Sequence, residues 1–473
     1  MKRRILNITV AIIMSVNCLF PTSSFAQYTK LFDFAGTANG SNPNGSLVSD
    51  GTFLYGMTLN GGTYNLGTIF KIKTDGTGYS KLLDFNGVNG KRPYGSLIYD
   101  GTFLYGMTRE GGTHGNAFRI KPDGTGYSQI LDFTGIANGK SPQGDLVSDG
   151  TFLYGTTRQG GANDLGTVFK IMPDGSGYAK LVDFSGTTDG SDPAGSLISI
   201  GSSLYGMTSA GGANSMGVVF KINSDGSGHS DLLDFTGVSN GQGPFGSFVD
   251  DGAFLYGMTE IGGTAGTYGD GTIFKIMPDG SGYAKLLDFT GVANGIHPFG
   301  SLISDGIFLY GMAFKGGTGS CTDGCGTLFK IKTDGTGFTK LLDFTGTANG
   351  SNPIGSLVSD GTFLYGMTSL GGANNLGTVF KYQFAPAGIA ENNMSNNFSV
   401  YPNPFNHQTS ITFAQEQKNI TIKIIDVFGK EIKTINLTGK EITIEKGALR
   451  AGIYFIQVID ENKNVGNKKI VIE

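Results

Sequence analysis

The stretch Phe53-Leu54-Tyr55-Gly56-Met57-Thr58 recurs along this chain of 473 residues. Phe, Tyr and Met alternate in it with Leu, Gly and Thr, and a period of two is typical of a β-strand. The tyrosine occurs in seven copies, at Tyr55, Tyr105, Tyr154, Tyr205, Tyr256, Tyr310 and Tyr365. A segment that returns at a nearly fixed interval indicates a repeat architecture built from one structural unit.

Each unit also contains an Asp-Phe pair, and successive pairs lie 48 to 55 residues apart. The aspartates are Asp33, Asp84, Asp132, Asp183, Asp234, Asp288 and Asp343. Three further segments are short and rich in β-forming residues, namely 67–72 (GTIFKI), 79–85 (YSKLLDF) and 95–101 (GSLIYDG). Turn residues such as Asp75-Gly76 separate the segments, and seven of the 14 prolines share one loop position. The pattern predicts four strands per unit.

Four short strands in a unit of about 50 residues are typical of a β-propeller blade, and kelch-like repeats have a similar length. We predict an all-β fold, a seven-bladed β-propeller over residues 27–382 followed by a small C-terminal β-sandwich. An open β-solenoid is the alternative, although its rungs are usually shorter and it needs end caps. If the tyrosine strand is innermost, two strands from each end of the repeat region would complete the last blade and close the ring.

The composition excludes several classes of protein. The net charge is −4, and no dense basic run follows the N-terminus, so nucleic acid is not an expected partner. Four histidines and three cysteines are scattered, which argues against a recurrent metal site. Of the 79 glycines, 73 fall within residues 28–382, where turns and close strand approaches need them.

The first 26 residues have the pattern of a secretory signal peptide. Basic residues at positions 2–4 precede an apolar run over 5–20, and small residues at Ser24 and Ala26 place the expected cleavage before Gln27. A membrane anchor is the alternative, but the apolar run is shorter than the roughly 20 residues that span a bilayer.

Two repeated features, the tyrosines and the Asp-Gly turns, could serve binding, but a structural role in the fold is the simpler explanation for each. The seven tyrosines could form an aromatic rim for sugars, yet a residue needed in every blade is better explained by packing between blades. The Asp-Gly turns could coordinate calcium, yet they lack the succession of oxygen ligands of an EF-hand loop and match hairpin turns.

A binding site should break the sevenfold symmetry, and the connection after the tyrosine strand does so. It has 8, 6, 8, 8, 11, 12 and 8 residues in successive units, so the long loops are 260–270 and 314–325. Long loops on a rigid scaffold often bind ligands, although neutral drift in length is an equal alternative. The predicted binding residues are Tyr268, Asp270, Lys315 and Asp323.

The second long loop also contains Cys321 and Cys325. In an oxidising compartment, two cysteines this close are expected to form a disulfide, whereas zinc would need two further ligands. No Ser-His-Asp order, phosphate loop or dinucleotide fingerprint stands out, so we predict no catalytic residues, no metal and no cofactor. Glycosidase carboxylates cannot be selected from so many repeated aspartates.

The repeats resemble the GloVer tandem-repeat family of secreted bacterial proteins. LYGMT, the double glycine, GTxFKI and DGTGY carry the resemblance, in that order, over residues 28–382. It implies the architecture and export, and it brings no catalytic residues to carry over. Departures are local: Ile200 and Ser203 replace the usual Asp and Phe in the fourth unit, and His229 and Phe338 replace the tyrosine of DGTGY.

After the repeats, residues 383–397 have the composition of a linker, and a different pattern follows over 398–473. Glycine is scarce there, and alternating segments predict about seven strands, which is typical of a small β-sandwich. We therefore expect a separate C-terminal domain.

This tail resembles the type A C-terminal sorting domain of the type IX secretion system. The matching residues are Tyr401, Pro402, Asn403, Pro404, Asp426, Gly429, Gly452, Tyr454, Lys468 and Lys469. The resemblance implies recognition by the type IX machinery and passage across the outer membrane, followed by release or attachment to surface lipopolysaccharide. A generic adhesion module is the alternative.

We expect a monomer that is secreted or displayed on the cell surface, with the propeller binding an extracellular glycan or protein or serving a structural role. The alternative is a secreted polysaccharide hydrolase or lyase with its site in the mouth of the propeller. The fold alone does not decide between these functions.

Overall fold

The computed structural model describes residues 27–264, 269–384, 398–426, 431–447, 449, 452–459 and 465–472. All regular structure within these ranges is β-strand, as predicted. Across the same ranges, no helix has the length and apolar character needed to cross a membrane. The predicted signal peptide, residues 1–26, and the linker residues 385–397 lie outside the described residues.

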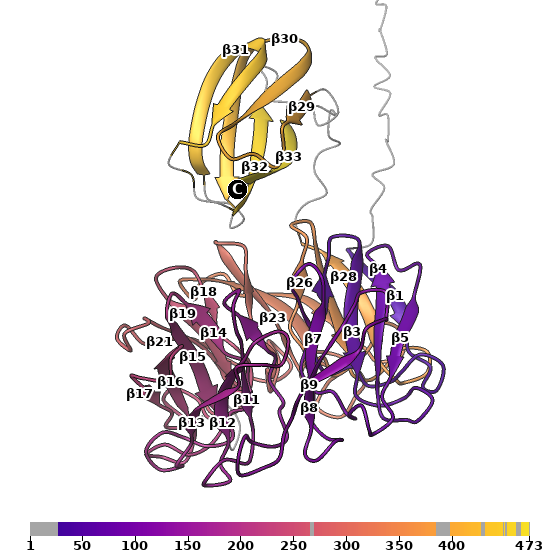
Figure 1. The fold of residues 1–473 in the computed structure, drawn as a ribbon, viewed down its shortest axis with the longest axis vertical. Coiled ribbons are helices and arrows are strands. Elements are labelled where there is room, and N and C mark those ends of the chain that lie inside the picture. Colours follow the sequence, from indigo (N-terminus) through magenta and orange to yellow (C-terminus); the bar gives the residue numbers. More distant parts are fainter. Residues whose placement is uncertain are drawn as a thin grey trace, which may run out of the picture.

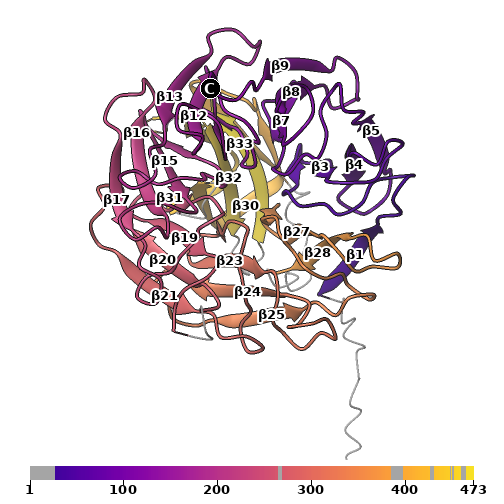
Figure 2. The ribbon, with the colours of Figure 1, turned by 90° about the horizontal axis from the view of Figure 1, so that it is seen from below.

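The repeat region forms seven four-stranded antiparallel sheets that follow one another around a ring in chain order (Figures 1 and 2). The fold is a β-propeller, and each sheet is one blade. The first strand of each blade lies nearest the axis: β2 (Val48–Ser49), β6 (Ile98–Tyr99), β10 (Val147–Ser148), β14 (Ile198–Ile200), β18 (Val249–Asp250), β22 (Ile303–Ser304) and β26 (Val358–Ser359).

The tyrosine strand comes second. These strands are β3 (Phe53–Thr58), β7 (Leu104–Thr108), β11 (Leu153–Thr157), β15 (Ser203–Thr208), β19 (Leu255–Thr259), β23 (Phe308–Ala313) and β27 (Phe363–Thr368). The third strands are β4 (Thr68–Lys73), β8 (Asn116–Ile120), β12 (Thr167–Ile171), β16 (Val218–Asn223), β20 (Thr272–Ile276), β24 (Thr327–Lys332) and β28 (Thr378–Gln383). The outermost strands are β5 (Ser80–Asp84), β9 (Ser128–Asp132), β13 (Ala179–Asp183), β17 (Ser230–Asp234), β21 (Ala284–Asp288), β25 (Thr339–Asp343) and β1 (Tyr28–Asp33).

Ring closure differs from the prediction because the tyrosine strand is not innermost. The last blade has the strand order β1-β28-β27-β26, so one strand comes from the N-terminal end and three from the C-terminal end. The prediction of two strands from each end is therefore wrong. The sequence of β1, YTKLFD, matches the outermost strand of the other blades, and it pairs antiparallel with β28 from Tyr28↔Tyr382 to Asp33↔Thr378.

Neighbouring blades pack through unlike faces of the same strands. Tyr55 of one blade shares a buried cluster with Leu104 and Phe118 of the next. Equivalent clusters recur around the ring, and one of them joins the last blade to the first. Gly56 faces Phe70 within its own blade, and a Cβ at Gly56 would lie 2.7 Å from that ring. Glycine therefore leaves the space that the phenylalanine fills.

The tail is a single five-stranded sheet in the order β29-β30-β32-β33, with β31 paired to β30. Its strands are β29 (Phe398–Tyr401), β30 (Gln408–Asp426), β31 (Glu431–Glu445), β32 (Gly452–Ile459) and β33 (Val465–Ile472). The seven predicted strands are thus five, because two predicted pairs each run on as one long strand.

The long hairpin of β30 and β31 bends, so that this single sheet curls into a barrel-like shape, and a bridge between Phe405 and Ile472 joins the two ends of the domain. The first part of β30 pairs with β29, at Phe398↔Phe413, and the second part pairs with β32, at Thr421↔Ile459. Register shifts in the β30–β31 pairing between Thr412 and Ile420 mark the bend. Buried side chains from all five strands form one apolar core.

Candidate functional site

Antiparallel pairing places two sets of loops on one face of the propeller. In each blade, the start of the innermost strand, the end of the tyrosine strand and the start of the third strand all lie at the same end of the sheet. The loops after the tyrosine strands and the loops between blades therefore share this face, which we call the axial face. The loop 314–325 and the described parts of the loop 260–270, residues 260–264 and 269–270, belong to it.

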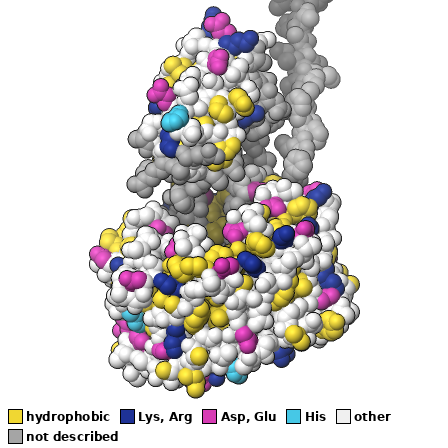
Figure 3. All heavy atoms as spheres, in the orientation of Figure 1, with side chains coloured by type: hydrophobic (Ala, Val, Ile, Leu, Met, Phe, Trp, Pro, Cys, Tyr) yellow, Lys and Arg dark blue, Asp and Glu magenta, His cyan; other side chains and the backbone are white. Residues whose placement is uncertain are grey.

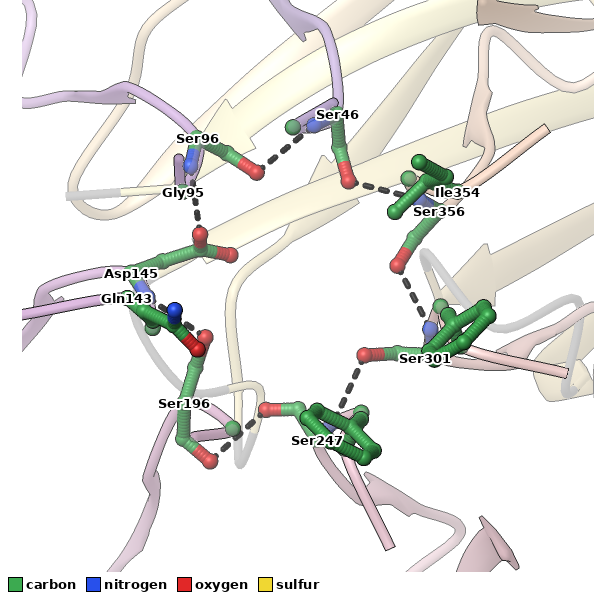
Figure 4. Close-up of a pocket in the computed structure, with 18 of the residues that line it drawn as sticks. Ser46, Gly95, Ser96, Gln143, Asp145, Ser196, Ser247, Ser301, Ile354 and Ser356 are labelled. Carbon is green, nitrogen blue, oxygen red and sulfur yellow. Dashed lines mark hydrogen bonds between the residues drawn. The ribbon is translucent and has the colours of Figure 1, made fainter. Parts of the chain in front are cut away.

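A ring of Gly-Ser steps surrounds the axis on this face (Figure 4). In most blades the serine amide donates a hydrogen bond to the side-chain oxygen of the equivalent residue in the next blade. These bonds are Ser46 to Ser96 (2.7 Å), Ser96 to Asp145 (2.5 Å), Asp145 to Ser196 (2.7 Å), Ser247 to Ser301 (2.7 Å), Ser301 to Ser356 (2.7 Å) and Ser356 to Ser46 (2.7 Å). The Ser247 hydroxyl instead donates to the Ser196 carbonyl oxygen at 3.0 Å.

The backbones approach so closely at this ring that a side chain is excluded before each serine. A Cβ at Gly95 would lie 2.6 Å from the Gly144 carbonyl oxygen. The predicted strand 95–101 is shorter, since the Ser96 amide bonds to Asp145 of the next blade and only Ile98 and Tyr99 pair as a strand. The ring encloses an opening of about 90 Å³.

Asp145 is the one carboxylate among the seven axial positions, since the other six carry serine. Burial raises the pKa of the Asp145 carboxyl, and hydrogen bonds from the Ser96 amide and from the hydroxyls of Ser96 and Ser196 oppose that rise. A carboxyl whose pKa lies above its usual range keeps its proton to higher pH and is therefore available as a proton donor over a wider pH range.

The residue before each axial glycine differs from blade to blade. These residues line the opening and are, in ring order, Asn44, Tyr94, Gln143, Ala194, Phe245, Phe299 and Ile354. The first three are polar or amphipathic and the last four are apolar, so the opening has a polar half and an apolar half. The sequence could have revealed this position through alignment of the seven units with one another.

Three phenylalanines extend the apolar half towards the sixth blade. The rings of Phe245 and Phe299 lie edge to face with their centroids 5.4 Å apart, and Phe299 contacts Phe314 in the same way at 5.2 Å. Phe314 is the first residue of the longest loop. The long loop of the sixth blade therefore reaches the axial opening through an aromatic contact.

The structure brings some of the predicted binding residues together. Lys315 forms an ion pair with Asp323 across their loop, with Nζ 3.1 Å from Oδ2. Asp270 lies at the edge of the fifth-blade loop, where its carbonyl oxygen accepts a hydrogen bond from the His297 amide at 2.9 Å. Tyr268 lies outside the described residues. The binding role of all four remains a prediction.

Two titratable residues beside this loop pair were not singled out from the sequence. His297 Nδ1 lies 3.2 Å from the carbonyl oxygen of Glu260 and 3.8 Å from its carboxylate. Burial raises the pKa of Glu260 and lowers that of His297, and the charge of Lys315 adds to the lowering while the Glu260 carbonyl, Asp270 and Asp323 oppose it. His297 is therefore neutral at pH 7, and the pair is not an ion pair there.

Cys321 and Cys325 form a disulfide in the sixth-blade loop, with their Cα atoms 5.0 Å apart. Cys325 occupies the position of Leu66 and Leu376 in other blades, immediately before the glycine that opens the third strand. It is fully buried there. The disulfide thus ties the longest loop to a buried anchor.

The repeated tyrosines are buried, as the packing interpretation predicts, with exposed fractions of 1 to 3%. In six blades the tyrosine hydroxyl donates to the carboxylate five residues earlier, as Tyr55 does to Asp50 at 2.7 Å. In the fourth blade Ile200 stands at the acceptor position. Asp75 of the DGTG turn accepts hydrogen bonds from the amide and hydroxyl of Thr77, as expected of a hairpin turn.

In the tail, the segments that carry the first and last predicted motif residues contact each other. The Asn403 side chain accepts a hydrogen bond from the Val471 amide at 2.7 Å, and the Lys468 ammonium lies 5.6 Å from the centre of the Phe398 ring. The Tyr401 side chain is 79% exposed. Of the remaining motif residues, Pro402 and Pro404 flank Asn403, and Tyr454 packs against the core. Asp426 is the last residue of β30, Gly452 is the first of β32, and Lys469 lies in β33. Gly429 is outside the described residues.

Comparison with protein families accounts for both parts of the chain. The family described as the Gloeobacter/Verrucomicrobia repeat matches residues 18–152 and 113–322. The chain belongs to this family. The secretion system C-terminal sorting domain matches residues 399–473. Such a type IX sorting tail indicates secretion to the cell surface or the extracellular space and implies interaction with the secretion machinery.

Individual relatives are more distant. The endo-acting ulvan lyase of Formosa agariphila is 32% identical over 81 residues, which are 17% of this chain and 16% of the lyase. A fungal alcohol oxidase of the AA5 family, solved with copper, is 13% identical at a TM-score of 0.52, covering 94% of this chain and 98% of the oxidase. PorZ, a type IX surface component of Porphyromonas gingivalis, is 16% identical at a TM-score of 0.45, covering 93% of this chain and 61% of PorZ. The likeness to the oxidase is one of fold.

Proposed function

We propose that this protein is a secreted or surface-displayed propeller that binds an extracellular glycan or protein at its axial opening. The observation that carries the proposal is the contrast between a repeated frame and unrepeated side chains. Glycine recurs before every axial position and serine fills six of them, while the residue before the glycine takes six identities in seven blades. A position whose residue type is not fixed by the fold can vary to suit a ligand.

The proposed export route uses two targeting signals. A signal peptide over residues 1–26, cleaved before Gln27, would direct export across the inner membrane, and the sorting tail would direct the second crossing. Residues 383–397 would act as a linker between the propeller and the tail, and the mature chain would be a monomer.

Binding at the opening is tested with the mature chain, residues 27–473, on a glycan array, followed by calorimetry with any ligand found. Phe299→Ala removes an aromatic wall of the opening and should weaken binding by roughly tenfold, which is the loss of a good aromatic contact. Tyr64→Ala removes a ring that is 57% exposed on a loop of the first blade and should have no effect. Equal losses in the two variants would refute a site at the opening.

A secreted polysaccharide hydrolase or lyase is the second candidate, and Asp145 is the observation in its favour. A raised pKa at a single axial carboxyl suits a general acid. Asp145→Ser installs the residue of the other six blades, so the frame should persist. Release of new reducing ends or unsaturated uronate by the wild-type chain, abolished in Asp145→Ser, would establish the enzyme. Ligand binding without product in either protein would reject it.

A further inference from the structure

The second blade has the shortest connection after its tyrosine strand, six residues where four other blades have eight. Beside it lies a recess of about 460 Å³ on the axial face. Its polar lining is Lys91, Arg109, Glu110, Thr113, His114 and Ser141. His114 stands at the position that Leu66, Leu165 and Leu376 occupy in other blades.

Positive charge exceeds negative charge in this recess. The Lys91 ammonium and the Arg92 guanidinium each lie 3.3 Å from an oxygen of Glu110, so two cations share one carboxylate. Arg109 has no ion-pair partner among the described residues, and its guanidinium carbon lies 5.7 Å from the centre of the Tyr94 ring. Since the Arg109 side chain is half-buried, its charge is less screened than that of a fully exposed cation.

The second blade has the most positive charge at these positions, and in the third blade the equivalent cations Lys140 and Arg158 each have an aspartate of their own. In the first blade the equivalents of Lys91, Arg92 and Arg109 are Ser41, Asn42 and Leu59, and in the seventh they are Ser351, Asn352 and Ser369. No other unit carries a cation at all three positions. On the side of the propeller seen in Figure 3, by contrast, basic and acidic side chains are interspersed.

Arg109 also connects the recess to the axial opening. Its side chain lines the recess and lies over Tyr94, which lines the opening. A guanidinium offers a planar fork that fits a carboxylate or a sulfate through two parallel hydrogen bonds. An aromatic ring beside it offers the flat apolar surface against which a sugar ring packs.

We propose that the ligand of this face is an acidic polysaccharide. Its carboxylate or sulfate groups pair with Arg109 in the recess, Lys91 adds to the attraction, and a neighbouring sugar ring lies against Tyr94 at the opening. This inference rests on the proposed binding function and names the substrate class of that site. It also predicts that binding weakens as salt rises.

The test measures affinity of the mature chain for three polymers by calorimetry: polygalacturonate for carboxylate, dextran sulfate for sulfate, and dextran for a neutral chain. We expect one or both acidic polymers to bind and dextran to bind at least tenfold more weakly. Arg109→Gln should weaken acidic binding by roughly tenfold. Lys121→Gln removes the same charge from the opposite face and should leave affinity unchanged.

A second variant covers the case in which Arg109→Gln perturbs the fold. Replacing residues 109–115 with the sequence of 369–377 gives the second blade the eight-residue connection of the seventh, a loop that this propeller already accommodates. Acidic binding should be lost while the melting temperature is kept. Equal losses in Arg109→Gln and Lys121→Gln, or equal affinity for dextran, would overturn the inference.

The two proposals can also fail separately. If neutral glycans bind in a manner that depends on Phe299 while acidic polymers do not bind, the acidic ligand is wrong and the binding function stands. If no glycan or protein ligand binds the wild-type chain, both proposals fall.

Discussion

Each repeated tyrosine combines a buried ring with a hydroxyl that has one partner. Tyr256 is 2% exposed, and its hydroxyl donates to Asp251 at 2.7 Å. Tyr256→Phe keeps the ring and removes this bond to a charged acceptor. We expect the free energy of unfolding, measured with urea, to fall by about 1 to 2 kcal/mol.

The fourth blade provides the matched control for that substitution. Tyr205 is similarly buried, but Ile200 occupies the position of the acceptor. Tyr205→Phe should therefore change stability by less than about 0.5 kcal/mol. A loss as large as that of Tyr256→Phe would show that the aspartate is not the source of the effect.

Residues that repeat were easier to interpret from the sequence than residues that vary. Seven copies of one tyrosine predicted a packing role because packing acts in every blade. Tyr94 and Phe299 were missed because their position has no common residue and so looks like noise within the unit. Glu260 and His297 were missed because their significance lies in burial and contact, which single residues at dissimilar positions do not reveal.

At the scale of elements, the sixth-blade loop depends on its disulfide. Changing Cys321 and Cys325 together to serine removes a link between residues four apart within the 12-residue loop and leaves a hydroxyl at a fully buried position. We expect a loss of about 2 kcal/mol, the entropy gained by a short unlinked loop, and faster proteolytic cleavage within 314–325. Thermal melting and limited proteolysis measure the two effects.

A second double variant separates the two contributions. Cys321→Ser with Cys325→Leu also removes the link but restores the leucine that Leu66 and Leu376 provide in other blades. It should recover part of the melting temperature and none of the resistance to proteolysis. Full recovery of both would contradict a role for the covalent link.

Strand prediction succeeded where the alternation of residue types continues along the whole strand. The tyrosine strand spans Phe53–Thr58, as predicted, because neighbouring blades cover both of its faces. In the tail, the polar run around Gln415 to Asn419 looks like a break between two strands. The backbone remains paired there through a bend, with Gln417 opposite Gly439, so one strand continues. A strand that stays paired through a bend shows no regular alternation of residue types in the sequence at the bend.

At the scale of the whole molecule, ring closure is non-covalent and depends on one terminal strand. β1 supplies the outer edge of the last blade, and the Ser356 amide bonds to the Ser46 hydroxyl at the axis, 310 residues away in sequence. The ring is thus closed at its outer edge by strand pairing and at the axis by a side-chain hydrogen bond. The sequence predicted that the ends meet, but not the division of strands, because that depends on which strand lies innermost.

Export is a property of the whole chain, and the tail can be separated from the propeller to test it. The propeller has its own core clusters and the tail has another, and a hydrogen bond from the Val471 amide to the Asn403 side chain joins the two ends of the tail domain. Deleting residues 398–473 should leave a folded propeller in the periplasm of a host that carries the type IX system, with less than about a tenth of the wild-type amount outside the cell. Cell fractionation measures the distribution, and an unchanged melting temperature of the retained propeller serves as the control for folding. Undiminished delivery of the truncated chain would contradict the sorting role, whereas loss of delivery with an intact propeller would assign the second crossing to the tail.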